Sequence, residues 1–240
     1  MRFSVVIPAH NEASLLPRGL EAIHAAATHV AGGVEVVVVD NRSSDATAEI
    51  AAGAGARVVH SEARNISVVR NAGVRASAGE VVVTIDADSV MAPNALREID
   101  RLLRTNRFVG GGTKFVPERT SLGIWATTTL VAVATRAVGL SGAMFWCARA
   151  DFDAIGGFNE RQLVAEDLDF ARRLRAHGRR TGRKFTQLSA APLTISTRKF
   201  DRFGDWHMFA MALQLREIRA ARRGTDPAWA DRYFFDFNDS

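Results

Sequence analysis

The sequence predicts an α/β protein in which helices flank a mostly parallel central sheet. Short apolar strands alternate with helical segments through the first half of the chain. Repeated β–α units of this length form parallel sheets with helices on both faces. Polar residues directly follow three of the strands. Because such sheets bind ligands beyond the carboxyl ends of their strands, we expect a site at that edge.

Each element is supported by its own residues. Apolar, β-branched runs predict strands over residues 3–8, 35–39, 57–60 and 81–85. Helices are expected between them, from about 13 to 29 with Asn11 as cap, from 43–45 to the glycines at 53 and 55, from 67 to 76, and from 93 to 104. The alternation then stops, and residues 108–116 predict a strand before a helix that starts at Leu122.

The composition is that of a globular protein without disulfides. The chain has 240 residues, of which 47% are hydrophobic and 24% charged, and this length is ample for a buried core. Its single cysteine, Cys147, excludes an internal disulfide and a cysteine-based zinc cluster. We therefore expect a cytoplasmic protein, free or at the inner face of the membrane. The first eight residues are too short and too strand-like for a signal peptide.

The net charge of +5 comes mostly from arginines that gather between residues 161 and 223. Such a region attracts nucleic acid, an anionic membrane or a phosphorylated small molecule. Aromatic residues are not interleaved with these arginines and no DNA-binding motif occurs, so we expect no nucleic-acid partner. Most of the individual arginines are expected on solvated helix faces.

Residues 122–135 are the best candidate for a membrane segment, but we expect no transmembrane span. The segment has 14 residues before Arg136 interrupts it, and a spanning helix needs roughly 20 apolar residues. We predict a buried helix. The alternative is a helix lying on an apolar surface, with peripheral membrane contact through residues 122–140.

Asp86 and Asp88 follow the strand at 81–85 directly. Side chains two apart on an extended backbone point to the same side, so the two carboxylates can face one point. They repel each other unless a cation lies between them or one binds a proton. Hard oxygen ligands suit Mg²⁺ or Mn²⁺, which neutralise a diphosphate. The alternative is that both aspartates only form a turn.

Acidic residues occupy two further positions of interest. Asp40 ends the strand at 35–39, where it can accept hydrogen bonds from a base imide or a ribose hydroxyl. The G-x-G-x-x-G fingerprint is missing, which disfavours a nicotinamide or flavin cofactor. Glu166 and Asp167 begin a predicted helix. They either complement its dipole or include a general base that takes a proton from an acceptor hydroxyl.

Together these motifs resemble the inverting glycosyltransferases of family 2, which have the GT-A fold with a Rossmann-like sheet. The resemblance is carried by residues 5–12 (VVIPAHNE), 38–47 (VVDNRSSDAT), 70–73 (RNAG), 85–89 (IDADS) and 156–158 (GGF), followed by Glu166 and Asp167. The match covers about residues 3–185. It implies a single GT-A domain over 1–240, with a nucleotide-sugar-binding part at about 1–115 and an acceptor-binding and catalytic-base part at about 116–240.

The resemblance also implies a role for each site residue. The nucleotide sugar, with UDP favoured and GDP as the alternative, is expected to bind Pro8, Ala9, Asn11, Glu12, Asp40, Arg70, Asp86 and Ala87. Arg198, which lies beyond the match, is also expected to bind it. Asp88 and Asp86 would hold Mg²⁺ or Mn²⁺. Asp167 would deprotonate the acceptor hydroxyl, with Glu166 beside it. That hydroxyl would attack the anomeric carbon in line and invert it, as the nucleoside diphosphate departs.

Four side chains outside the main motifs carry further expectations, and two of these have alternatives. Arg198 either places a cation on the diphosphate or belongs to a surface strand. His207 is either a third metal ligand or a packed histidine. Arg172 and Arg173 are expected to help keep Asp167 ionised.

The departures from the family pattern narrow the expected activity. The Gln-x-x-Arg-Trp motif and the membrane spans of processive relatives are absent, which favours transfer of a single hexose by a soluble enzyme. Two alternatives stay open. One is a phosphotransferase of the haloacid dehalogenase type that uses Asp86 and Asp88, and the other is a non-catalytic nucleotide-sugar binding module. The acceptor, the sugar and the oligomeric state are not predicted.

Overall fold

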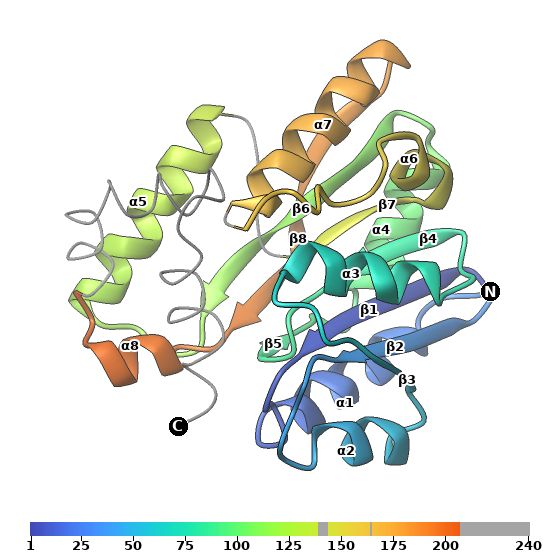
Figure 1. Cartoon of the computed structure of the whole chain (residues 1–240). Coiled ribbons are helices and arrows are strands. Elements are labelled where there is room, and N and C mark those ends of the chain that lie inside the picture. The colour runs from blue at the N-terminus through green and yellow to red at the C-terminus, as the bar shows by residue number, and fades with distance from the viewer. Residues whose placement is uncertain (139–143, 164, 207–240) are drawn as a thin grey trace.

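A computed structural model describes residues 1–138, 144–163 and 165–206 of the chain (Figure 1). Its strands are β1 (Phe3–Ala9), β2 (Val34–Asp40), β3 (Arg57–His60), β4 (Val81–Thr84), β5 (Ser89–Val90), β6 (Phe108–Pro117), β7 (Phe145–Ala148) and β8 (Lys184–Ile195). Its helices are α1 (Leu16–Ala27), α2 (Thr47–Gly53), α3 (Ile66–Arg75), α4 (Ala95–Arg104), α5 (Leu122–Val138), α6 (Arg149–Ala154), α7 (Glu166–Arg180) and α8 (Arg198–Phe203).

All eight strands form one sheet in the order β3-β2-β1-β4-β7-β6-β8-β5. The strands β3, β2, β1 and β4 are parallel, and so are β6 and β8. β7 runs antiparallel to both of its neighbours, and β5 runs antiparallel to β8. The predicted class, a mostly parallel sheet flanked by helices, is therefore confirmed.

Helices cover both faces of the sheet because alternate strand residues point to opposite sides. On one face, Val5 and Val38 belong to a core cluster with side chains of α1, α2 and α4. On the other face, Val6 and Val37 pack with side chains of α3, α6 and α7. Phe158 lies in this second cluster, stacked on a phenylalanine of α7 with the ring centroids 4.3 Å apart.

The predicted element boundaries need small corrections. α1 begins at Leu16, and Asn11 lies outside it in the left-handed region with φ 51° instead of capping it. α3 is capped by Asn65, whose Oδ1 accepts from the backbone N–H of Ser67 at 2.8 Å. α7 begins at Glu166 as predicted.

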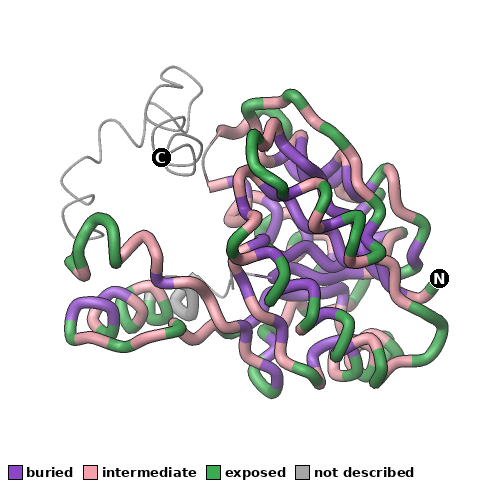
Figure 2. The backbone as a smooth tube through the Cα atoms, turned by 90° about the horizontal axis from the view of Figure 1, so that it is seen from below, coloured by how far each residue is buried: buried purple, intermediate pink, exposed green. Residues whose placement is uncertain are grey.

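The prediction that the helix at 122–135 is buried was wrong for most of its large side chains. Leu122, Trp125, Leu130 and Val133 are each more than half exposed, and Ile124 is buried. The helix lies beside α8, away from the two helical layers on the sheet (Figures 1 and 2). The apolar side chains of this helix are spread around its circumference instead of forming one stripe. Packing of one side against the protein therefore leaves apolar side chains on the other sides exposed. No helix within the described ranges is long and apolar enough to cross a membrane.

Candidate active site

A cavity of about 210 Å³ lies at the carboxyl ends of β1 and β4. Its walls come from these strand ends, from α3, from the first turn of α7 and from the start of α8. The lining residues are Pro8, Ala9, His10, Glu12, Asn41, Ile66, Val69, Arg70, Asp86, Ala87, Asp88, Glu166, Asp167, Arg198 and Lys199. Segments up to 191 positions apart in sequence, from Pro8 to Lys199, thus meet at the edge where a ligand was expected.

Asp86 and Asp88 both line the cavity, but not from a strand. β4 ends at Thr84, and the two aspartates lie in the turn that leads to β5. The turn is closed by a bond of 3.1 Å from the backbone N–H of Ser89 to the carbonyl of Asp86. Asp86 is half exposed, and the Asp88 side chain is 24% exposed. Burial and the charge of Asp86 raise the pKa of Asp88.

Arg70 is the centre of the site. Its Nη1 donates to Glu166 Oε1 at 2.9 Å and to Asp167 Oδ1 at 2.7 Å, and its Nη2 donates to Asp86 Oδ1 at 2.8 Å. Burial lowers the pKa of Arg70, but the three carboxylates outweigh burial, and its net pKa is raised. One guanidinium therefore joins the Asp86 turn to the first turn of α7.

Asp167 carries a perturbed carboxyl group. Burial raises its pKa to about 7, Glu166 and Asp86 act in the same direction, and Arg70 opposes them. Its side chain is still 37% exposed, so a solvent-borne hydroxyl can reach it. A carboxylate with a pKa near the working pH is suited to proton transfer.

The cation beside Asp167 is not one of the predicted arginines. Arg172 is exposed on α7, and Arg173 donates to Asp169 Oδ2 at 2.6 Å and to the carbonyl of Ile155 at 2.7 Å. The expectation that these two arginines keep Asp167 ionised was therefore wrong. Arg70, which lies 97 positions earlier in the sequence, makes that contact instead.

Arg198 reaches the cavity from the start of α8. Its Nη1 donates to Glu12 Oε2 at 2.8 Å, its Nη2 donates to Glu12 Oε1, and Nη2 lies 3.4 Å from Asp88 Oδ2. Lys199 lies beside it and also lines the cavity. Burial lowers the pKa of Lys199, which Asp88 partly offsets. The segment after β8 thus adds two cations opposite the acidic turn.

Two of the predicted residues that the structure describes, Asn11 and Asp40, do not line this cavity. Asn11 joins two loops, because its Oδ1 accepts from the backbone N–H of Ser44 at 2.7 Å. Asp40 is 9% exposed, and its carboxylate is bonded to His60 Nδ1 at 3.0 Å and to the backbone N–H of Ser43 at 3.3 Å. His207 lies outside the described residues.

Several lining residues were missed by the sequence reasoning. His10 and Asn41 belong to the matched loops, and His10 Nδ1 lies 2.6 Å from the carbonyl oxygen of Asn41. Ile66 and Val69 supply an apolar wall from α3. The signal for His10 and Asn41 was available, since both lie in loops that were already placed at the ligand-binding edge.

The residues fit a hard divalent cation. Asp86 and Asp88 offer oxygen ligands, and the raised pKa of Asp88 reflects unfavourable burial of negative charge that a cation would relieve. Within the described ranges no group of three or more histidine, cysteine or acidic side chains forms a cation site. Mg²⁺ usually keeps several waters and binds through one or two carboxylates together with substrate phosphates, so two aspartates suffice.

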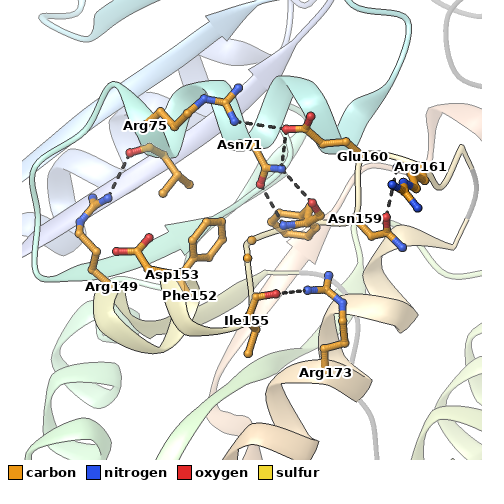
Figure 3. A pocket seen from close by; sticks show the side chains of 14 residues that line it. Asn71, Arg75, Arg149, Phe152, Asp153, Ile155, Asn159, Glu160, Arg161 and Arg173 are labelled. Carbon is orange, nitrogen blue, oxygen red and sulfur yellow. Dashed lines mark hydrogen bonds and ion pairs between the residues drawn. The ribbon is translucent and has the colours of Figure 1, made fainter.

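A second, larger cavity of about 600 Å³ lies between α3, α6 and the 155–161 segment (Figure 3). Arg149 and Arg173 at its wall are bonded to backbone carbonyl oxygens. Asn71 faces the same segment. Its Nδ2 donates to Glu160 Oε1 (Figure 3) and to the backbone carbonyl of Phe158. Among the residues predicted for the site, none that the structure describes lines this cavity.

Comparisons with known proteins show the family of this chain. Residues 4–157 match the family model described as glycosyl transferase family 2. An uncharacterised glycosyltransferase of Mycobacterium tuberculosis is 38% identical over 102 residues, which cover 41% of this chain and 44% of that protein. The chain therefore spans less than half the length of this curated relative.

Two solved structures show the same fold at low sequence identity. S. aureus TarS 1-349 in complex with UDP-GlcNAc has a TM-score of 0.66 and 19% identity, with 82% of this chain and 59% of that chain covered. The mannosyltransferase PcManGT from Pyrobaculum calidifontis in complex with GDP-Man and Mn²⁺ has a TM-score of 0.64 and 21% identity. That match covers 80% of this chain and 56% of the mannosyltransferase.

Proposed function

Because the chain belongs to glycosyl transferase family 2, we propose that it moves one sugar from a nucleoside diphosphate sugar to an acceptor hydroxyl with inversion. The observation that carries the proposal is the convergence of Asp86, Asp88 and Asp167 on one cavity, with Arg70 between them. This arrangement provides a leaving-group side and a proton-accepting side within one site.

Asp167 is the proposed general base. Its carboxylate lies in the first turn of α7, is partly open to solvent and has a pKa of about 7. A carboxyl group whose pKa lies near neutral is partly ionised at that pH, and its ionised form can take the acceptor proton. Glu166 is only 10% exposed and shares Nη1 of Arg70 with Asp167, so its proposed role is to position the guanidinium.

The donor is proposed to lie over the Pro8–Glu12 loop and the Asp86–Asp88 turn. Pro8, Ala9, Glu12 and Ala87 line the cavity there. A bound Mg²⁺ or Mn²⁺ would neutralise the departing diphosphate. Arg198 and Lys199 add positive charge opposite Asp88, where the phosphates of a donor would lie.

UDP is the favoured nucleotide and GDP the alternative. The two structures with this fold contain UDP-GlcNAc and GDP-Man, respectively, so they support both. Asp40 is proposed to accept the N–H of the base from the position next to Asn41, which lines the cavity. Its oxygens are bonded to His60 and Ser43, so the base would have to share or replace one of these partners.

We propose that residues 1–240 form one domain, with the donor-binding part at about 1–115 and the acceptor-binding part at about 116–240. Peripheral membrane contact through residues 122–140 stays a proposal. The exposure of Trp125 and Leu130 on α5 supports it, because large apolar side chains on a helix surface favour an interface.

A thermal-shift panel tests the function directly. The protein is mixed with UDP, GDP, TDP and CDP sugars, each with and without Mn²⁺, and the best donor is then used in a transfer assay. We expect stabilisation by one donor only when metal is present, followed by release of the nucleoside diphosphate. Phosphate released from simple phosphomonoesters would favour the haloacid dehalogenase alternative. Donor binding without transfer to any acceptor would favour the binding module.

A further inference from the structure

We propose that Asn71 and Phe158 are positioning residues for Arg70. In this arrangement the side-chain amide of Asn71 holds the backbone of Phe158, and the ring of Phe158 supports the guanidinium that binds Asp86, Glu166 and Asp167. The inference rests on the proposed function only for its kinetic readouts. The contacts themselves are independent of it.

Asn71 binds both backbone groups of one residue. Its Oδ1 accepts from the N–H of Phe158 at 2.9 Å, and its Nδ2 donates to the carbonyl of Phe158 at 2.9 Å. Nδ2 also donates to Glu160 Oε1 at 3.0 Å (Figure 3). Asn71 is 6% exposed, and a primary amide is the side chain that can donate and accept in this way. Asn71 therefore fixes the position of the Phe158 backbone relative to α3.

The residue before Phe158 must be glycine for this contact to form. Gly157 has φ +66°, and a Cβ there would lie 2.7 Å from Asn71 Oδ1. Asn65 holds the far end of the same loop, because its Nδ2 donates to the carbonyl of Glu160 at 2.7 Å. One helix, α3, thus holds the loop at two points, at its N-terminal cap and near its middle.

Phe158 connects this loop to the acidic site. Its ring is 1% exposed and stacks on Phe170 of α7, with centroids 4.3 Å apart and planes 16° apart. The Cζ atom of Arg70 lies 5.3 Å from the centroid of the same ring. A guanidinium above an aromatic face is attracted to it, and the contact limits where the guanidinium can lie.

Arg70 and Asn71 are neighbours in the sequence with different partners. Arg70 binds the three carboxylates, and Asn71 binds the loop whose ring supports Arg70. A shift of Phe158 would therefore change how one guanidinium is shared among Asp86, Glu166 and Asp167. The chemistry would suffer although no group that touches the substrates had been removed.

The test uses Asn71→Ala and Phe158→Leu, with Phe145→Leu as matched control. Phe145 is a buried ring of the same core cluster that contacts Phe170 edge-on with the centroids 5.4 Å apart, so its removal costs similar packing without removing the ring beside Arg70. We expect kcat to fall at least about 10-fold in both test variants, with the donor KM changed less than about threefold. Phe145→Leu should lose thermal stability and keep most of its kcat.

A double-mutant cycle separates positioning from general destabilisation. Each variant is combined with Arg70→Met, which removes the guanidinium. If Asn71 and Phe158 act through Arg70, their substitution lowers kcat little further in that background, whereas Phe145→Leu has the same effect in both backgrounds. Fully additive effects of Asn71→Ala and Phe158→Leu would overturn the proposal and leave the proposed function standing.

A measurement that does not depend on enzymatic activity distinguishes failure of this inference from failure of the proposed function. Nitrogen-detected NMR of the arginine side chains, with Arg70→Met as the assignment control, reports whether the Arg70 guanidinium rotates. We expect hindered rotation in the wild type and in Phe145→Leu, and free rotation in Phe158→Leu, which also carries the test if Asn71→Ala does not fold. Free rotation already in the wild type, or hindered rotation in Phe158→Leu, would refute the inference. Absence of any sugar transfer by the wild type would refute only the proposed function.

Discussion

The substitution Asp167→Asn separates the proposed chemistry from the architecture of the site. Asn keeps an oxygen at the position that accepts from Arg70 Nη1 at 2.7 Å, and it removes the group that would take the proton. Loss of a general base lowers turnover by about 10²- to 10⁴-fold. We therefore expect kcat to fall by at least about 10²-fold, while the affinity for nucleotide and metal stays nearly the same.

The substitution should also change stability. Ionisation of Asp167 disfavours the folded wild type at neutral pH, because the pKa of this carboxyl is raised from 3.8 to about 7. Asn carries no charge, and it keeps an oxygen that accepts an ordinary hydrogen bond from Arg70 Nη1. We therefore expect Asp167→Asn without metal to be at least as stable as the wild type at neutral pH, and nearly equal to it at about pH 4.

The assay compares Asp167→Asn with Asp169→Asn. Asp169 lies two positions after Asp167 on the same helix. Its carboxylate pairs with Arg173 at 2.6 Å instead of with Arg70. Turnover, nucleotide affinity and Tm are measured for both variants. Asp169→Asn should retain most of its turnover. Near-normal transfer by Asp167→Asn would place the base elsewhere and refute the reasoning.

Four further predictions follow from the same contacts. Asp88→Ala should abolish metal-dependent nucleotide binding with the fold intact, and full wild-type activity in excess chelator would exclude the metal site. Asp40→Asn should weaken donor binding by about 1–3 kcal/mol, measured by calorimetry, if Asp40 accepts the base N–H; unchanged affinity would exclude that role. The folded pKa of Asp167 is raised from 3.8 to about 7, so its contribution to stability is lost as pH rises from about 4 to about 7. Without metal, the wild type should lose more stability than Asp167→Asn between pH 5 and pH 8 in parallel denaturation series, and parallel curves would contradict the raised pKa. Replacing Trp125 and Leu130 together by Gln should reduce sedimentation with anionic phospholipid vesicles, and equal sedimentation would argue against membrane contact through α5.

Sequence patterns were sufficient to predict which segments form the site, because the carboxyl ends of parallel strands lie at one edge of the sheet. Apolar runs such as Val36–Val39 could only be buried strands, and the polar residues after them had to meet at one edge. The local form of that edge was harder to predict. Asp86 and Asp88 converge through a turn after Thr84, whereas an extended strand had been assumed. The turn brings both carboxylates to the cavity, so the proposed metal site does not depend on the extended geometry.

The misassignment of α5 has a different origin. A high content of apolar residues leads to burial only when other elements of the protein pack around the helix. The residue pattern of α5 has no single apolar stripe to indicate which face would be packed. Tertiary placement decides this, and the structure places the helix beside α8 with Trp125 and Leu130 exposed. The apolar residues that were taken as core are therefore available for an interface.

The ion-pair partners were the least predictable part of the site. Sequence proximity suggested that Arg172 and Arg173 would accompany Asp167, but successive helix residues point about 100° apart. The group that reaches Asp167 comes from α3, 97 positions away, and it also binds Asp86. That sharing has a chemical consequence. A divalent cation bound at Asp86 and Asp88 would compete with Arg70 for Asp86, and the guanidinium would then be left to Glu166 and Asp167. Binding of the metal and donor would thereby strengthen the ion pair between Arg70 and Asp167. This would lower the pKa of Asp167 and favour the ionised base when the donor is bound.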